Sequence, residues 1–182
     1  DEALRFGLFE LVSIATTTGF ATADFSLWPV FLPFLLFFLA FMGGCAGSTG
    51  GGLKVIRVLL VYKQGSRELK RLIHPNAIIP IRIGGRPVDD RVVEAVWGFF
   101  SVYLILYLIM TILLLATGLD FVTAFSAVGA CINNLGPGLG DVAAHYGEIT
   151  DFAKWVLSFA MLLGRLEIFT LLVLFTPTFW RQ

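Results

Sequence analysis

ELVSIATTTGFATADF, residues 10–25, has a counterpart 117 positions further along the chain in SAVGACINNLGPGLGDV, residues 126–142. At this offset Gly19 aligns with Gly136. Each copy joins a short helix-compatible stretch, a turn rich in Thr, Asn and Gly, an acidic residue and a long apolar segment. The sequence therefore contains an internal repeat, and this repeat decides the fold class.

The composition is typical of a membrane protein. The chain of 182 residues is 57% hydrophobic and 14% charged, with a mean hydropathy of +0.85, which lies outside the range of ordinary soluble domains. Three apolar segments are near or above the roughly 18–20 residues that a helix needs to cross a bilayer, namely 25–42, 95–118 and 152–180. The helix-compatible stretches 3–15 and 121–132 are too short to span. We expect an all-α integral membrane protein in which these two stretches are re-entrant half-helices.

The charges predict the orientation in the membrane. Nine of the thirteen Lys and Arg residues lie between Lys54 and Arg91, so the positive-inside rule puts this segment in the cytoplasm. The acidic residues that follow the two turns, Asp24 and Asp141, then lie on the outer side, where they would attract cations. Within the cytoplasmic segment, AIIPIRIGGRPV at residues 77–88 alternates around a Gly-Gly pair and predicts a short hairpin.

The turns TTTGFAT, residues 16–22, and NNLGPGLG, residues 133–140, predict a pore. Non-helical backbone at membrane depth is tolerated only where it is buried in protein or lines a water-filled cavity. Gly19 and Gly136 allow the dihedral angles that aim successive carbonyl oxygens at a dehydrated cation. The C-terminal ends of the half-helices carry a partial negative charge that favours a cation at the same place. Ordinary external loops would also be rich in Gly and Thr, but they would not recur in register behind matching half-helices.

A glycine-rich stretch, FMGGCAGSTGGGLKVI at residues 41–56, interrupts the first long apolar run. Six of the ten residues 43–52 are glycine, and each glycine destabilises a helix by roughly 1 kcal/mol relative to alanine, so we expect a loop that crosses a wet cavity and acts as a gate. The residues of this predicted gate loop are Gly43, Gly44, Gly47, Ser48, Thr49, Gly50, Gly51 and Gly52. A phosphate-binding loop is excluded, because Leu53 stands where its lysine is required.

Arg165 lies midway along the last apolar segment and aligns with Ser48 at the repeat offset. An arginine at the bilayer centre costs about 2.5–3.5 kcal/mol on insertion scales, so it must face the protein interior or water. We hypothesise that Arg165 holds the gate loop closed by hydrogen bonds and forms an electrostatic barrier to cations. The alternative is a structural arginine that pairs with Glu167 on a neighbouring helix.

Together, TTTGFAT, GGCAGSTGGGLK, GGRPV and NNLGPGLG resemble the third and fourth repeats of the TrkH family, the membrane subunits of Trk potassium uptake systems in the Trk/Ktr/HKT superfamily. The resemblance covers essentially the whole chain. It implies tandem units of membrane helix, pore helix and membrane helix, four around one pore, as in potassium channels. We expect the chain to be the C-terminal part of a longer polypeptide, without at least one helix that precedes Asp1.

On this interpretation residues 1–62 are a third pore repeat without its first membrane helix, 63–92 a cytoplasmic linker and hairpin, and 93–182 a fourth pore repeat. The expected parts of the third repeat are a pore helix at 3–15, a filter at 16–22 and a pore-lining helix at 25–62 that is broken at 43–52. Those of the fourth are a membrane helix at 93–118, a pore helix at 121–132, a filter at 133–140 and a membrane helix at 150–178.

The resemblance implies potassium uptake through a channel-like pore whose simplified selectivity filter takes one glycine from each repeat. Backbone carbonyls would hold the potassium ion, with no organic cofactor, at Thr17, Thr18, Gly19, Phe20, Asn134, Leu135, Gly136 and Pro137. The implied location is the bacterial inner membrane, in which the protein is multi-pass. The implied partners are a cytosolic nucleotide-binding regulatory subunit of the Trk-A type and a second copy in a homodimer, with no nucleic acid.

Two other functions remain open. A secondary transporter with broken helices would couple cation fluxes by alternating access, although the two repeats here run in the same sense. A non-conducting membrane scaffold that binds a partner through its hairpin would leave the paired turns and Arg165 without explanation. Enzymatic activity is not expected, because these motifs supply no set of nucleophile, base and orienting group.

Overall fold

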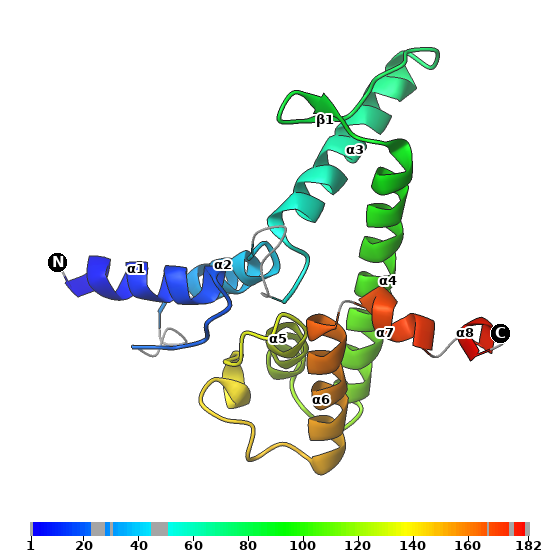
Figure 1. The fold of residues 1–182 in the computed structure, drawn as a ribbon. Coiled ribbons are helices and arrows are strands. Elements are labelled where there is room, and N and C mark those ends of the chain that lie inside the picture. Colours follow the sequence, from blue (N-terminus) through cyan, green and yellow to red (C-terminus); the bar gives the residue numbers. More distant parts are fainter. Residues whose placement is uncertain are drawn as a thin grey trace.

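The structure, a computed structural model, describes residues 2–22, 28–29, 31–44, 51–166, 168–174 and 177–180. These residues form helices and one short hairpin (Figure 1). In chain order the elements are α1 (Glu2–Ala15), α2 (Phe31–Phe41), α3 (Val55–Ile73), β1 (Arg82–Ile83), β2 (Arg86–Pro87), α4 (Asp90–Leu115), α5 (Phe121–Ile132), the 3-10 helix η2 (Gly140–Val142), α6 (Asp151–Arg165), α7 (Ile168–Leu174) and α8 (Pro177–Trp180).

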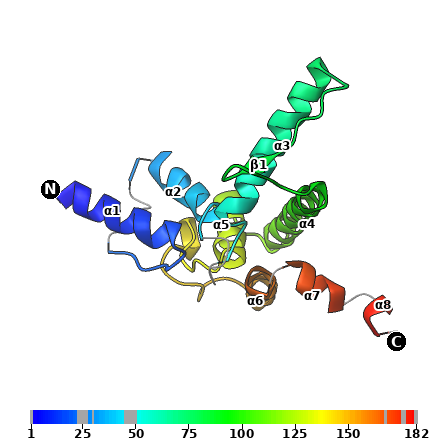
Figure 2. The same ribbon diagram turned by 45° about the horizontal axis from the view of Figure 1, so that its top comes forward.

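The helices form one packed unit with long projecting arms. α1 and α2 lie side by side at the N-terminal end of the molecule, and α3 leads away from them toward the hairpin (Figures 1 and 2). α4 returns from the hairpin to α5 and α6, and these three helices pack against one another. α7 and α8 extend to the side, far from the N-terminus. The shape is therefore open, and apolar faces of the arms stay exposed in the isolated chain.

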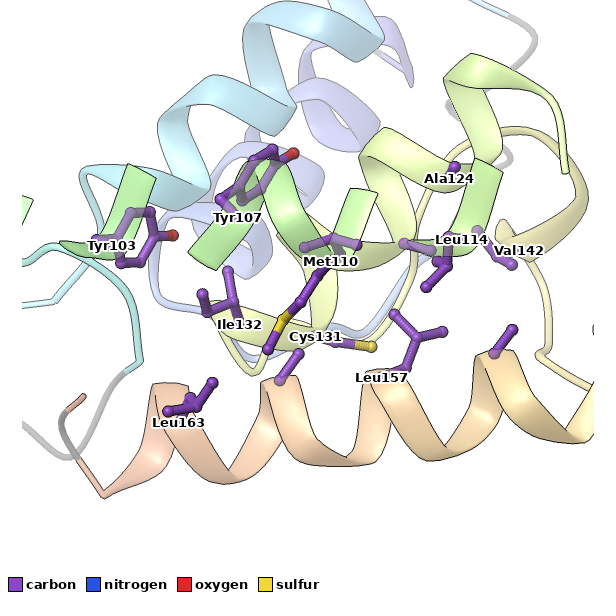
Figure 3. Close-up of a cluster of buried hydrophobic side chains, with 14 of the residues drawn as sticks. Tyr103, Tyr107, Met110, Leu114, Ala124, Cys131, Ile132, Val142, Leu157 and Leu163 are labelled. Carbon is purple, nitrogen blue, oxygen red and sulfur yellow. The ribbon is translucent and has the colours of Figure 1, made fainter. Parts of the chain in front are cut away.

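α5 lies at the centre of the packed unit because its sequence is apolar or small on every side. Its residues 126–132 are all buried. Figure 3 shows Met110 of α4 and Leu157 of α6 reaching the same region as Cys131 and Ile132 of α5. The short helix is thus enclosed by the two helices that flank it in the sequence.

The two repeats are packed into each other through α2 and α5. The buried ring of Phe37 on α2 occupies the space that a Cβ on Gly129 would need, so a larger residue there would displace this ring. Leu135, in the turn after α5, is buried in a cluster with Ile14 of α1 and Leu36 of α2. The second turn is therefore anchored among the helices of the first repeat.

By length and composition, one helix of the described residues could cross a membrane by itself, namely α4. A second crossing results if α6 and α7 are counted as one span. α2 and α5 are apolar but have only 11 and 12 residues. α5 occupies the range 121–132 that the sequence predicts for the second half-helix.

The last apolar segment differs from the single helix expected over 150–178. It forms α6, α7 and α8, and the axes of α6 and α7 are inclined at 108°. α6 ends at Arg165, directly after Gly164, whose backbone packs against the end of α5. α8 begins at Pro177, because a proline has no N–H to continue a preceding helix but is tolerated at a first helical position.

The helix expected from residue 25 also begins later. Residues 28–29 are not helical, and α2 starts at Phe31, so that Pro33 falls in its first turn, where a proline removes no helical hydrogen bond. α2 ends at Phe41 and α3 begins at Val55, which brackets the glycine-rich stretch expected to break the helix.

The hairpin forms between β1 and β2, with Ile83 opposite Arg86. The two residues between them, Gly84 and Gly85, have φ angles of 56° and 81°. Both angles are positive, as in the type I′ turn that matches the twist of paired strands and that glycine adopts without strain. The Gly-Gly pair therefore fixes the register of the hairpin.

Candidate functional site

The backbone leaves α1 and α5 in the same way, at positions 117 residues apart. In each copy three amide groups after the helix donate to carbonyl oxygens of its last turns, at distances of 2.8–3.1 Å. The matched pairs are Thr16 N to Val12 O with Asn133 N to Gly129 O, Thr17 N to Ile14 O with Asn134 N to Cys131 O, and Thr18 N to Ser13 O with Leu135 N to Ala130 O. The sequence repeat is therefore also a repeat of backbone hydrogen bonding.

The dihedral angles repeat as well. Thr17 and Asn134 both have a φ of 54°, a left-handed conformation that is uncommon for residues other than glycine. A left-handed residue commonly ends a helix, because it turns the following amides back onto the last carbonyls. Two positions later, Gly19 and Gly136 have φ angles of 82° and 107°. These two residues are the glycines that the sequence singles out.

The two turns touch. A Cβ on Gly19 would collide with the carbonyl oxygen of Leu135 and would lie 3.4 Å from the Cδ of Pro137. Gly19 therefore combines two requirements that only glycine meets, a positive φ and a close approach to backbone. The predicted filter residues of both copies are thus brought side by side by tertiary packing.

The first turn is held by two side chains of α1. Glu10 is fully buried, and its Oε1 accepts from the backbone amide of Thr22 at 2.7 Å. The hydroxyl of Ser13 donates to the carbonyl oxygen of Phe20 at 2.6 Å. The sequence analysis did not select either residue, although Glu10 is the one acidic residue between Glu2 and Asp24 and could have been found on that ground.

The second turn is held by different side chains. The buried hydroxyl of Ser126 accepts from the amide of Leu139 at 2.8 Å and lies 3.1 Å from its carbonyl oxygen, to which it can donate. Leu139 corresponds to Thr22 at the repeat offset, so the same amide is fixed in both copies by unrelated groups. The hydroxyl of Tyr146 donates to the carbonyl oxygen of Gly136 at 2.7 Å. Nothing in the sequence pattern marks Ser126 or Tyr146.

The hydrogen-bonded carbonyl therefore differs between the copies. Within the predicted filter segments 17–20 and 134–137, it belongs to Phe20 in the first turn and to Gly136, which corresponds to Gly19, in the second. A carbonyl oxygen has two lone pairs, so each can still approach a cation. The two turns nevertheless offer a cation different sets of oxygens.

Glycines of the interrupted helix and of α6 pack against the C-terminal ends of α1 and α5. A Cβ on Gly43 would lie 2.5 Å from the carbonyl oxygen of Ala15. A Cβ on Gly51 would collide with the carbonyl oxygen of Asn133, and one on Gly164 with that of Ile132. The described ends of the glycine-rich stretch thus lie against the residues at which α1 and α5 end and the two turns start.

Asn134 links the glycine-rich stretch to α6. Its side-chain nitrogen would lie 3.0 Å from a Cβ on Gly51 and 2.8 Å from a Cβ on Gly164. Because Gly164 precedes Arg165, the end of α6 that carries the arginine is next to the stretch. Arg165 itself is the last residue of α6, and its side chain is exposed.

Of the predicted gate residues, Gly43, Gly44, Gly51 and Gly52 are described. The amide of Val55 donates to the carbonyl oxygen of Gly44 at 3.3 Å, so the two ends of the stretch are joined by a backbone hydrogen bond. Other residues named above lie outside the described residues, namely Asp24, Gly47, Ser48, Thr49, Gly50 and Glu167.

The acid at the start of α5 caps the helix. Asp120 accepts from the amides of Val122 and Thr123 at 3.0 and 3.3 Å. Hydrogen bonding, above all from the side chain of Thr123, holds the pKa of Asp120 below its ordinary value. The hydroxyl of Thr123 also accepts from the amide of Asp141 at 3.2 Å. One threonine therefore ties the start of α5 to the acidic residue after the second turn.

The two turns offer backbone oxygens as possible ligands of a cation. Among the described residues, no group of three or more His, Cys, Asp or Glu side chains could hold a metal ion. The turns themselves carry backbone carbonyl oxygens, a type of ligand that suits a hard cation that has lost its water.

Comparisons with known proteins agree over the whole chain. The model of the TrkH family, described as cation transport proteins, matches residues 1–182. The Trk system potassium uptake protein TrkH of Halomonas elongata is 61% identical over 181 residues, which is 100% of this chain and 38% of the relative. The protein of the same name from Escherichia coli K12 is 59% identical over 174 residues, 96% of this chain and 36% of the relative.

A solved structure gives the same result. The crystal structure of the potassium transporter TrkH from Vibrio parahaemolyticus superimposes with a TM-score of 0.91 at 60% sequence identity. It covers 99% of this chain, which corresponds to 38% of that protein. The chain thus spans less than two fifths of the length of the proteins that it matches.

Proposed function

Because the chain belongs to the TrkH family of cation transport proteins, as its motifs indicate, we propose that it lines a potassium-selective pore and takes part in potassium uptake. The relatives with which it shares about 60% of its residues are named potassium uptake proteins. In this proposal the whole protein crosses the bacterial inner membrane several times and is built from tandem units of membrane helix, pore helix and membrane helix.

One observation carries the proposal, namely the contact between two turns whose backbones leave their helices in the same way. Each turn follows a short helix, has a left-handed residue at its second position and a glycine of positive φ two residues later. Gly19 packs against the carbonyl of Leu135. Such an arrangement suits a simplified selectivity filter, in which potassium loses its water and is held by backbone oxygens of the two four-residue segments 17–20 and 134–137.

The helix ends add an electrostatic contribution. α1 and α5 end at Ala15 and Ile132, so the partial negative charges of both helices lie next to the turns. A cation between the turns would be stabilised, and an anion would be repelled. We assign potassium as the transported ion, with no organic cofactor.

The glycine-rich stretch is the proposed gate. Its described residues Gly43, Gly51 and Gly52 pack against the carbonyl ends of α1 and α5 or against the Asn133 side chain. A segment at this place would lie in the path of an ion that leaves the filter. A small movement would open the path, because glycine has no side chain that must be repacked.

Arg165 is proposed to keep the gate closed. Asn134 lies between Gly51 and Gly164, which brings the end of α6 to the glycine-rich stretch. A guanidinium group there can donate to the carbonyls of the stretch and raises the energy of a passing cation. On the cytoplasmic side, a nucleotide-binding regulatory subunit would act on the gate, and the whole protein would be a homodimer.

The test is ion flux through the whole protein in liposomes. We expect potassium and rubidium to pass and sodium to be largely excluded, and we expect higher potassium flux in Arg165→Ala and in a variant that lacks several glycines of 43–52. Lys154→Ala is the matched control, because Lys154 lies on the same helix at the other end, where its Nζ pairs with Asp151 at 3.2 Å. Its flux should equal that of the unchanged protein.

Three outcomes would contradict the proposal. No flux from folded protein would favour the scaffold. Potassium movement that requires a second cation on one side would favour the secondary transporter. Loss of folding in Arg165→Ala without a gain of flux would make Arg165 a structural residue.

A further inference from the structure

A basic pocket lies between α3 and the residues that lead into the hairpin, away from the two turns and the glycine-rich stretch. Its volume is about 280 Å³, and its basic side chains are Lys63, Arg67, Lys70 and Arg82. No carboxylate is among the described residues that line it. The three basic residues of α3 are spaced by four and three positions, so they share one face of the helix.

The walls of this pocket are fixed before any ligand binds. Ile81 is only 4% exposed and is clustered with Leu60 of α3 and Val93 of α4. The Nζ of Lys63 donates to the carbonyl oxygen of Arg82 at 2.8 Å, which joins α3 to β1. A ligand would therefore not have to order the chain around it.

The pocket keeps a net positive charge. Arg67 is buried, and its Nη1 lies 2.5 Å from the Oδ1 of Asp90, so this pair is largely neutral. Lys70 makes no ion pair among the described residues, and neither Lys63 nor Arg82 has a carboxylate partner there. Three cations thus remain for a ligand of opposite charge.

The other end of the pocket is apolar. Leu59 lines it one turn before Lys63 on α3, and Tyr62, which directly precedes Lys63, is 74% exposed. The sequence puts the boundary between the apolar segment and the cytoplasmic segment 63–92 at this point. The apolar end of the pocket therefore faces the hydrocarbon side, and the basic end faces the cytoplasmic head groups.

We propose that this pocket binds the phosphate of an anionic phospholipid of the inner leaflet. Lys63, Lys70 and Arg82 surround the phosphate, which lysine recognises as a point charge, while Leu59 and Tyr62 contact the start of the acyl chains. A lipid fits better than a soluble phosphate because the site has both an apolar and a basic end. This inference rests on the membrane orientation of the proposed function and is independent of ion conduction.

The test uses the whole protein, purified in a non-ionic detergent and titrated with phosphatidylglycerol or phosphatidylcholine, with bound lipids counted by native mass spectrometry. We expect preferential retention of phosphatidylglycerol, weakened roughly fivefold by either Lys70→Gln or Lys63→Gln. Arg86→Gln is the control, because Arg86 lies on β2 outside the pocket and its replacement removes the same charge. This control should retain phosphatidylglycerol like the unchanged protein.

Equal retention of the two lipids, or an equal loss in Arg86→Gln and Lys70→Gln, would overturn the proposal. Displacement of phosphatidylglycerol by inorganic phosphate alone would make free phosphate the ligand. Unchanged lipid retention in Lys70→Gln, with weaker co-purification of a cytosolic protein, would assign the pocket to a protein interface. Because lipid retention is read without ion flux, a protein that retains the lipid but carries no potassium would refute only the proposed function.

Discussion

Replacement of Gly164 by alanine should destabilise this protein, although the same replacement stabilises most helices. Gly164 is the second-last residue of α6, and alanine is preferred over glycine in a helix by at most about 1 kcal/mol, the value for an interior position. Here the added Cβ would collide with the carbonyl oxygen of Ile132 and would lie 2.8 Å from both the Ile132 carbonyl carbon and the Asn134 side-chain nitrogen. Two of these three atoms belong to the backbone of α5, so no change of rotamer can relieve the contact.

The magnitude follows from these two opposing effects. An extra methyl group in a packed interior typically costs about 1–3 kcal/mol, and the gain in helix propensity offsets about 1 kcal/mol of it. We therefore expect a net loss of up to about 2 kcal/mol in the free energy of unfolding. α6 would also be pushed against the second turn through Asn134, so the selectivity for potassium over sodium should fall.

Gly98→Ala is the matched control. Gly98 also lies in a helix, α4, and a Cβ there would meet only the Cζ of Phe169, at 3.8 Å, which is an ordinary contact. This variant should be as stable as the unchanged protein or more stable by up to about 1 kcal/mol. The assay is the unfolding midpoint of the two variants in the same detergent, followed by ion flux in liposomes. A midpoint for Gly164→Ala at or above that of Gly98→Ala would refute the packing of α6 against α5.

Three further substitutions test the groups around the turns. Ser126→Ala removes both hydrogen bonds of the buried Leu139 backbone and should lower stability by about 1–3 kcal/mol, measured as the unfolding midpoint. Asp120→Ala should cost about 1 kcal/mol at neutral pH through the lost cap. Folding lowers the pKa of Asp120. The stability that this carboxylate contributes is therefore complete above the unfolded pKa of about 3.9 and is lost as the pH falls through the folded pKa. The difference in stability between the variant and the unchanged protein should vanish in acid. Tyr146→Phe frees the Gly136 carbonyl and should reduce selectivity for potassium over sodium while the protein still folds; unchanged selectivity would show that the hydroxyl has no role in the turn.

Features that depend on neighbours in the sequence were predictable. The Gly-Gly pair predicts the hairpin, because only residues that accept positive φ form its two-residue turn, and Gly84 and Gly85 have those angles. The short apolar stretch after Asp120 predicts α5 with its cap. The glycine-rich stretch separates α2 from α3, because consecutive glycines cannot sustain a helix.

Other features could not be found in this way. The last apolar segment has a high enough hydropathy to predict one continuous helix over 150–178, yet it is divided into α6, α7 and α8. The hydropathy of a segment measures how apolar it is. It does not show where contacts with a neighbouring helix coincide with the end of a helix. The break follows Gly164, whose contact with Ile132 joins residues that are 32 positions apart in the sequence.

Local patterns in the sequence are enough to identify a helical membrane protein with a repeated turn, because hydropathy, charge bias and the spacing of glycines can be read along the chain without knowledge of the packing. Only the tertiary structure brought Gly19 against Leu135 and set Asn134 between Gly51 and Gly164. Only the tertiary structure shows that Glu10 and Ser126 accept hydrogen bonds from equivalent amides and that Tyr146 donates to the Gly136 carbonyl. These contacts depend on how two repeats pack at close range, and that packing is decided by the shapes of side chains and backbone far apart in the sequence.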